Sequence, residues 1–435
     1  MKLLKLREYF NQFRRSILAY QYDYLYETNK AIIETTLKGI GDNIHAKNNQ
    51  VRRISRTIAQ YTCQFSSRPK ASLWFFEISC ALFLPAYLTL KVFSSIWRNK
   101  SKSRKFYDGV QIVFAERWKS NPEIFLIPSE LRAAKIKTKI ISEKWLAPSD
   151  IVLLWKLFKL SFLGKTPFPT QLVFKCAVDL AAVRGCLSNI STQYIIVYWE
   201  FSCSLSLITH ALENEGVGVY NVMHGDKHFY AKHAFFESSR CYCWNSFYIN
   251  IFKKGYAKSD FRVFENPAFT LNNHEKIKTN QSQPLSIGIA TPHMATLGNT
   301  FTQAAAITEH FVDTINSLSK KYHITIRPHP FYKTELDSIL RHLDGKTLVE
   351  QPNAKLPRKF LLGSHIVIGT ISTLLIEAAK IGIQVIVIQT PAMVDIEKYH
   401  FLYTFDNVRK SSLDDLKKNI EEIEKQLQHT IDTNL

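Results

Sequence analysis

A short loop in the last third of the chain combines residues that can bind an anion. The loop is Arg327-Pro328-His329-Pro330, directly after the apolar run ITI at 324–326. Two prolines stiffen it, so that a guanidinium and an imidazole N–H are held in place as donors to phosphate oxygens. The alternative interpretation is an ordinary proline-rich turn with an exposed histidine.

A second loop, GTIST at 369–373, offers hydroxyl groups at the start of a predicted helix. The hydroxyls of Thr370, Ser372 and Thr373, with the unpaired backbone N–H groups of a helix start, suit an anion. Glu377 lies one turn further along and is placed to reach a ribose diol. The alternatives are simple helix capping by Ser372 or Thr373, and a glutamate that faces solvent.

A third strand end, Thr291-Pro292-His293, completes the predicted cradle together with GNT at 298–300, which opens the next helix. All three loops follow predicted strands of one parallel sheet. Because open α/β sheets bind ligands beyond the carboxyl ends of their strands, we expect the loops to form one site.

A patch nearer the middle of the chain could supply a catalytic base. The segment MHGDKH at 223–228 follows the apolar run VGVYNVM. His224 or Asp226 could take a proton from a substrate hydroxyl, and a neutral His224 is favoured near pH 7. Glu200, at the end of YIIVYWE (194–200), is a second candidate base. A structural role for each of these side chains is the alternative.

Metal and cofactor motifs are missing from the sequence. A zinc site at this patch matches no HEXXH or CxxC spacing; its possible ligands would be His224, His228, His233, Cys241 and Cys243. There is no Asp-x-Asp pair, no GxGxxG fingerprint and no P-loop, which argues against hydride transfer and ATP hydrolysis. We expect neither a metal nor a cofactor.

Short β-rich runs alternate with helix-length segments from about residue 108, which predicts parallel sheets covered by helices on both faces. The predicted strands before the polar segment Thr270 to Pro284 are 110–114, 123–127, 137–142, 194–199, 217–223, 240–244 and 261–265. The predicted elements after it are strands 285–291, 323–330, 365–370 and 383–390 and helices 301–319, 333–342, 373–381 and 411–428. That polar segment has almost nothing to bury and predicts an interdomain linker.

The predicted fold class is α/β, with two Rossmann-like, doubly wound domains that face each other across a cleft. The predicted regions are 1–105, basic, helical and membrane-associated; 106–269, the N-terminal Rossmann-like domain; 285–410, the C-terminal one; and 411–435, a terminal amphipathic helix with Ser411 as its N-cap. Leu3, Leu6, Phe10, Phe13 and Ile17 follow helical spacing in the first region.

A net charge of +19 and a pI near 9.5 favour an anionic partner such as nucleic acid, anionic lipid or a phosphorylated substrate. No RRM, KH or zinc-finger pattern supports nucleic acid. The seven cysteines include no CxxC, which indicates reduced, mostly buried thiols in a cytoplasmic protein. The N-terminus has no apolar run typical of a secretory signal.

The stretch from Ser72 to Trp97 approaches the length and hydropathy of a membrane span but contains Glu77, Pro85 and Lys91. It has three interpretations: a true span, a buried helical hairpin, or an element lying on a membrane surface. Basic residues flank it and favour an anionic bilayer surface. These are Arg52, Arg53, Arg56, Arg68, Lys70, Arg98, Lys100, Lys102, Arg104 and Lys105.

The order of the motifs, over roughly residues 190–395, resembles bacterial surface-polysaccharide transferases of the GT-B fold. The pattern is similar to capsule sialyl- and Kdo-type transferases and to the CDP-glycerol glycerophosphotransferases of teichoic acid synthesis. The resemblance implies that His329, Ser372 and Thr373 contact the phosphate or nucleotide of the donor. It also implies a catalytic role for His224.

The expected activity is therefore metal-independent glycosyl transfer from a CMP-, CDP- or UDP-linked sugar to a glycan or lipid-linked acceptor, in capsule or lipopolysaccharide synthesis. The donor site would comprise Thr291, Arg327, His329, Pro330, Thr370, Ser372, Thr373 and Glu377. The enzyme is expected in the cytoplasm, peripherally bound to the anionic inner membrane. The alternatives are a glycerophosphotransferase, a nucleotide-sugar 2-epimerase of the same fold and, least favoured, a nucleic-acid-binding protein.

Overall fold

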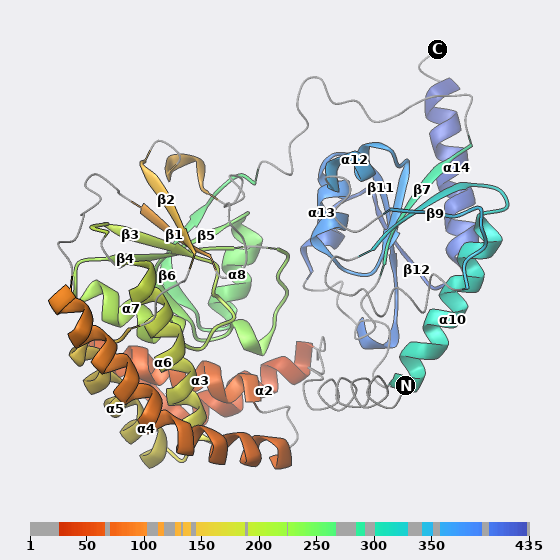
Figure 1. Ribbon diagram of the computed structural model, residues 1–435. Coiled ribbons are helices and arrows are strands. Elements are labelled where there is room, and N and C mark those ends of the chain that lie inside the picture. The colour runs from red at the N-terminus through yellow and green to blue at the C-terminus, as the bar shows by residue number, and fades with distance from the viewer. Residues whose placement is uncertain are drawn as a thin grey trace, which may run out of the picture. The chain divides into compact units, whose positions relative to one another are not determined.

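Two parallel six-stranded sheets organise the described part of the chain (Figure 1). A computed structural model describes residues 26–65, 70–101, 112–116, 127–131, 134–140, 145–187, 190–223, 225–266, 284–291, 301–328, 342–350, 357–393 and 400–432. The first unit is built from Glu27–His224 and Phe229–Glu265, and the second from Gly225–His228 and Asn266–Leu435.

The sheet of the first unit has the strand order β2-β1-β3-β4-β5-β6, and all its pairs are parallel. Its strands are β1 (Ile112–Glu116), β2 (Ile136–Ile140), β3 (Tyr194–Val197), β4 (Gly218–Val222), β5 (Glu237–Cys243) and β6 (Lys258–Val263). The order reverses between β1 and β3, so this pair forms the topological switch point of the sheet.

The helices of the first unit form two layers. The inner helices α6 (Pro169–Cys186), α7 (Leu205–Glu213) and α8 (Ser246–Lys254) contact the strands. The outer helices are α2 (Tyr26–Ile40), α3 (Asn49–Phe65), α4 (Lys70–Ser101) and α5 (Pro148–Leu163). Helix α3 packs on α7, whereas α4 and α5 pack on α6. From Glu27 onward the described part of the predicted 1–105 region therefore belongs to the first unit, and the predicted helix at residues 3–17 lies outside the described residues.

Three arginines of α3 are inside the unit. The guanidinium of Arg52 donates to both carboxylate oxygens of Glu237 at 2.9 and 3.0 Å, and Arg53 donates to the same carboxylate at 2.8 Å. Arg56 adds an ion pair at 3.3 Å and donates to the carbonyl oxygen of Tyr256. The expectation that these arginines face a membrane is wrong, because a carboxylate at the start of β5 draws them into the core.

The stretch Ser72 to Trp97 lies in one continuous helix, α4, with Pro85 inside it. Among the described residues it holds the one segment long and apolar enough to cross a membrane, Trp74–Ser94, and only 6% of that window is buried. The buried-hairpin interpretation is wrong, because the helix does not turn back and most of its side chains are not covered.

The second unit has the strand order β12-β11-β10-β7-β8-β9, again entirely parallel. The strands are β7 (Ser286–Ala290), β8 (His323–Arg327), β9 (Leu348–Val349), β10 (Ile366–Gly369), β11 (Gln384–Ile388) and β12 (Val408–Ser411). Counted within the unit this is the order 6-5-4-1-2-3, which is that of the nucleotide-binding Rossmann fold, with its switch point between β7 and β10.

Alternate residues of these strands build the second core. Ile287, Ile289, Ile366 and Ile368 face a cluster that includes residues of α10 (Phe301–Leu318) and α14 (Leu416–Asp432). The opposite face is covered by α12 (Pro357–Leu362) and α13 (Thr373–Lys380), as Figure 1 shows. Continuous apolar strands of this kind arise because helices bury both faces of a parallel sheet.

The fold class is confirmed as α/β with two Rossmann-like units, and all seven cysteines are buried and free of disulfides. The terminal helix belongs to the second core through Leu416, Ile420 and Ile423. Ser411 is not its N-cap, because Ser411 ends β12, a strand that the periodicity did not predict. The predicted linker residues 270–283, most of strand 123–127 and most of helix 333–342 lie outside the described residues.

Candidate functional site

The predicted donor loops lie at one edge of the second sheet. In the parallel register Ala290 is opposite Arg327, and Ile289 is opposite Ile368. Thr291, Arg327 and Thr370 therefore all lie at the carboxyl ends of their strands. Strand β7 lies between β8 and β10, so Thr291 is placed between the strand ends that carry Arg327 and Thr370.

The turn at 369–373 lies at the topological switch point. A Cβ atom at Gly369 would lie 3.0 Å from the carbonyl oxygen of Ala290, so the glycine permits close approach of β10 to β7. Thr370 is buried, at 4% exposure. The chain then leaves the sheet through an extended Ser372 and enters α13 at Thr373.

Ser372 occupies the N-cap position of α13, but its side chain makes no capping hydrogen bond. Its Oγ is buried and has no hydrogen-bond partner among the described residues. A buried hydroxyl without a partner costs free energy, and a ligand oxygen that bonds to it would recover that cost. Ser372 therefore does not cap α13 through its side chain, and the alternative that it is a simple helix cap is wrong. Glu377 is half-buried one turn further along α13.

Thr373 and Asp226 are linked within the second unit, which includes Gly225–His228. The backbone N–H of Asp226 donates to Thr373 Oγ1 at 2.9 Å. Gly225 has φ +68°, a conformation that glycine adopts without strain, and a Cβ there would lie 3.4 Å from the same Thr373 oxygen. Thr373 thus holds the loop that carries Asp226.

The carboxylate of Asp226 faces a histidine that the sequence analysis did not select. His400 Nε2 lies 2.5 Å from Asp226 Oδ2, and both side chains are nearly closed to solvent. His400 Nδ1 accepts a hydrogen bond from the backbone N–H of Leu402, so Nε2 is the ring nitrogen that lies beside Asp226. With its carboxylate engaged in this way, Asp226 fits a positioning role better than that of a base. No sequence motif marks His400.

Arg327 is paired inside the protein. Its guanidinium donates to Glu350 Oε2 at 2.7 Å, and the Glu350 side chain is only 5% exposed. The guanidinium carbon also lies 5.8 Å from the centre of the Phe360 ring. The positive charge that was expected to face a phosphate is largely compensated by Glu350. His329 and Pro330, two residues further along, lie outside the described residues.

Glu200 lies at the carboxyl end of β3 in the first unit and is completely buried. Its Oε2 accepts a hydrogen bond from Asn221 at 3.1 Å, and its carbonyl oxygen accepts one from Gln60 of α3. A general base must reach the hydroxyl that it deprotonates. The buried network around Glu200 indicates a structural role, and His224, the other candidate, lies outside the described residues.

The described residues of the alternative zinc site, which exclude His224, do not converge. Within the described ranges, no three His, Cys, Asp or Glu side chains form a group that could hold a metal ion. The sulfur atoms of Cys241 and Cys243 are 3.9 Å apart, and the His233 ring packs edge-on against the rings of Tyr230 and Phe252.

No protein-family model and no curated protein matches the sequence. Three solved structures resemble the chain in part. Methanocaldococcus jannaschii UDP-GlcNAc 2-epimerase in complex with UDP-GlcNAc and UDP is 16% identical with a TM-score of 0.46, and the match covers 72% of this chain and 91% of that one. Anabaena HepE in complex with UDP and glucose is 10% identical with a TM-score of 0.38, covering 65% of this chain and 82% of that one. Acinetobacter baumannii MurG is 12% identical with a TM-score of 0.31, covering 74% of this chain and 90% of that one. All three TM-scores are below 0.5, so the function rests on this chain's own topology and residues.

Proposed function

We propose that the protein is a glycosyltransferase that moves a sugar from a nucleotide-activated donor to a glycan or lipid-linked acceptor. One observation carries the proposal: the buried Ser372 hydroxyl has no hydrogen-bond partner among the described residues, and it lies at the start of α13, at the switch point of a Rossmann-ordered sheet. The first turn of a helix presents unpaired N–H groups and a partial positive charge, which suit a phosphate group.

The same edge argues against a dinucleotide cofactor. In dinucleotide-binding folds the first strand leads into a glycine-rich turn, which lets the backbone approach a pyrophosphate. Here β7 leads into Thr291-Pro292-His293, and a glycine, Gly369, instead ends β10. The phosphate contacts would then come from 370–373 together with His329, with Glu377 near the ribose, and without a metal.

For the chemistry we propose His224 as the base that takes the proton of the acceptor hydroxyl. Asp226 is engaged with His400 and Glu200 is buried, so neither fits the role of the base. The motif order that resembles capsule transferases supports a surface polysaccharide or lipopolysaccharide product, made at the cytoplasmic face of the inner membrane of a bacterium.

Nucleotide binding tests the proposal directly. We expect one of CMP, CDP, UDP and GDP to raise the melting temperature of the full-length protein, because a ligand that binds only the folded state stabilises it. Ser372→Ala should raise the dissociation constant of that nucleotide by a factor of about ten, because one hydrogen bond to a charged group is lost. Ser317→Ala, which removes an exposed hydroxyl from α10 of the same unit, is the matched control.

A response to none of the four nucleotides, or an equal loss in both variants, would refute the donor site. Transfer is separated from epimerisation by the acceptor requirement. A transferase releases nucleotide in proportion to the acceptor added, whereas a 2-epimerase converts its substrate without any acceptor.

A further inference from the structure

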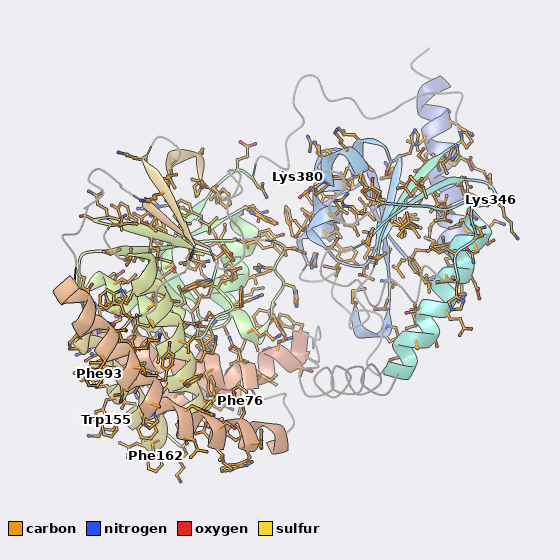
Figure 2. All side chains as sticks on the ribbon, in the orientation of Figure 1. Phe76, Phe93, Trp155, Phe162, Lys346 and Lys380 are labelled. Atoms are coloured by element: carbon orange, nitrogen blue, oxygen red, sulfur yellow. The ribbon has the colours of Figure 1, made fainter. Side chains whose placement is uncertain are left out.

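Two outer helices of the first unit leave large apolar side chains uncovered. Of sixteen exposed large apolar residues among those described, thirteen are on α4 and α5. They are Trp74, Phe75, Phe76, Ile78, Leu82, Phe83, Leu90 and Phe93 of α4, and Val152, Trp155, Leu160, Phe162 and Leu163 of α5. Figure 2 shows Phe76, Phe93, Trp155 and Phe162 on the same flank of the unit. Patches of this extent mark interaction surfaces, and we call these thirteen residues the α4–α5 surface.

Helix α4 is held against the protein along its other face. The carboxylate of Glu77 accepts hydrogen bonds from the backbone N–H groups of Thr170 and Gln171, at 2.8 and 2.7 Å, and so caps α6. Cys80 is buried, and the Tyr87 ring packs edge-on against Phe174 at 5.4 Å. To cross a membrane, the helix would have to leave α6 and uncover the start of that helix.

The exposed charges on the two helices themselves have one sign. Helices α4 and α5 contain one acidic residue each. Glu77 caps α6, and Asp150 is buried in an ion pair with Arg184 at 2.7 Å. Lys156 and Lys159 are exposed on α5, and no exposed carboxylate lies among the described side chains of the two helices.

We propose that the α4–α5 surface docks the enzyme in the plane of an anionic phospholipid bilayer. Aromatic and aliphatic side chains would enter the boundary between headgroups and acyl chains, while the lysines contact anionic headgroups. The absence of acidic residues on the surface favours this partner over a second copy of the chain, whose identical lysines would repel it. The α4–α5 surface would thus be the part of the protein that binds the membrane in the proposed function, and its binding does not depend on sugar transfer by the second unit.

Vesicle co-sedimentation of the full-length protein, without nucleotide or sugar, tests the inference. We expect binding to phosphatidylcholine vesicles that contain phosphatidylglycerol and much weaker binding to phosphatidylcholine alone. The double substitution Phe83→Glu and Phe162→Glu should reduce the partition coefficient by about tenfold or more, because two inserted rings are replaced by charges. Val263→Glu, at an equally exposed apolar position on β6, should bind like the unchanged protein.

Charge and binding mode have their own readouts. Lys156→Glu with Lys159→Glu should remove the preference for anionic vesicles, and an alkaline carbonate wash should release the bound protein. Should the double glutamate variant fail to fold, Phe83→Ser with Phe162→Ser replaces it.

Two outcomes would overturn the inference. Protein that stays on the vesicles after the carbonate wash would show that α4 spans the membrane instead of lying in its plane. Dimers without lipid that the double variant converts to monomers, with no vesicle binding, would assign the surface to a second copy.

Discussion

The two units share a doubly wound topology, yet the carboxyl edges of their sheets hold different chemistry. In the first unit α3 covers this edge, since Gln60 and Gln64 donate to the backbone carbonyls of Glu200 and Phe201. In the second unit the edge includes the Ser372 hydroxyl, which has no partner among the described residues. A shared doubly wound topology therefore does not decide which edge keeps polar groups available for a ligand; that depends on whether other groups of the protein already bond to them.

Helix α3 explains much of this difference. Arg52, Arg56, Gln60 and Gln64 follow one another at intervals of four residues, so they share one face of the helix. The arginines bind Glu237 at the start of β5, and the glutamines bind carbonyls beyond the end of β3. The glutamines thus bond to polar groups beyond the carboxyl edge of the first sheet, whereas the Ser372 hydroxyl at that edge of the second has no partner among the described residues.

The largest effect is expected for Glu237→Gln. The side chain is 4% exposed and holds three arginines, so its loss leaves buried charge without a partner. We expect a loss of about 3–5 kcal/mol in the free energy of unfolding of the first unit. All seven tryptophans lie between Trp74 and Trp244, so tryptophan fluorescence during urea unfolding reports this unit.

The matched control is Asp260→Asn, which breaks exposed ion pairs with Arg240 and Arg262 and should cost less than about 1 kcal/mol. Equal costs for the two variants would show that the arginine cluster does not stabilise the first unit.

A smaller effect is expected for Gly288→Ala in β7. An added Cβ would lie 2.5 Å from Ser364 Oγ and 2.7 Å from the Phe360 ring, which must then move away from the sheet. Overpacking of this kind costs about 1–3 kcal/mol. The loss should appear in the circular dichroism transition and leave the tryptophan transition unchanged.

Gly345→Ala, where nothing lies within 4 Å of the added atom, should be neutral by the same measurement. A shift of the tryptophan transition in Gly288→Ala would contradict the separate stability of the two units.

The smallest effect is an acid-dependent one. Burial alone would raise the pKa of Glu237, but hydrogen bonds and the positive charges of Arg52 and Arg53 outweigh it and hold the pKa below its ordinary value of 4.5. A carboxylate with a lowered pKa stabilises the folded state above pH 4.5, and that stability is lost as the pH falls through the folded-state pKa. The free energy of unfolding of the first unit should therefore fall as the pH drops below 4.5.

In Glu237→Gln this contribution to the acid dependence should disappear, as followed by tryptophan fluorescence in urea at a series of pH values. An unchanged pH profile in the variant would assign the acid sensitivity to other carboxylates.

Much of the fold and part of the site could be predicted from the sequence. Apolar runs such as 285–291 and 365–370 predict strands, and the structure confirms them, because a strand buried on both faces is apolar at consecutive positions. The loops with Thr291, Arg327 and Thr370 were correctly expected at one edge, because parallel strands end on the same side. Strand β12 (VRKS) was missed, because an edge strand need not be apolar along its length.

The sequence by itself therefore determined the two-unit α/β architecture and brought the loops of the proposed donor site to one edge of the second sheet. Only the tertiary structure decided the partners of individual charges. Arg52 meets Glu237 across 185 positions of the chain, and Asp226 meets His400, because residues distant in sequence become neighbours only when strands and helices pack. Packing also decided that α3 is buried and that α4 is exposed, although the sequence analysis had assigned basic residues of both to a membrane surface.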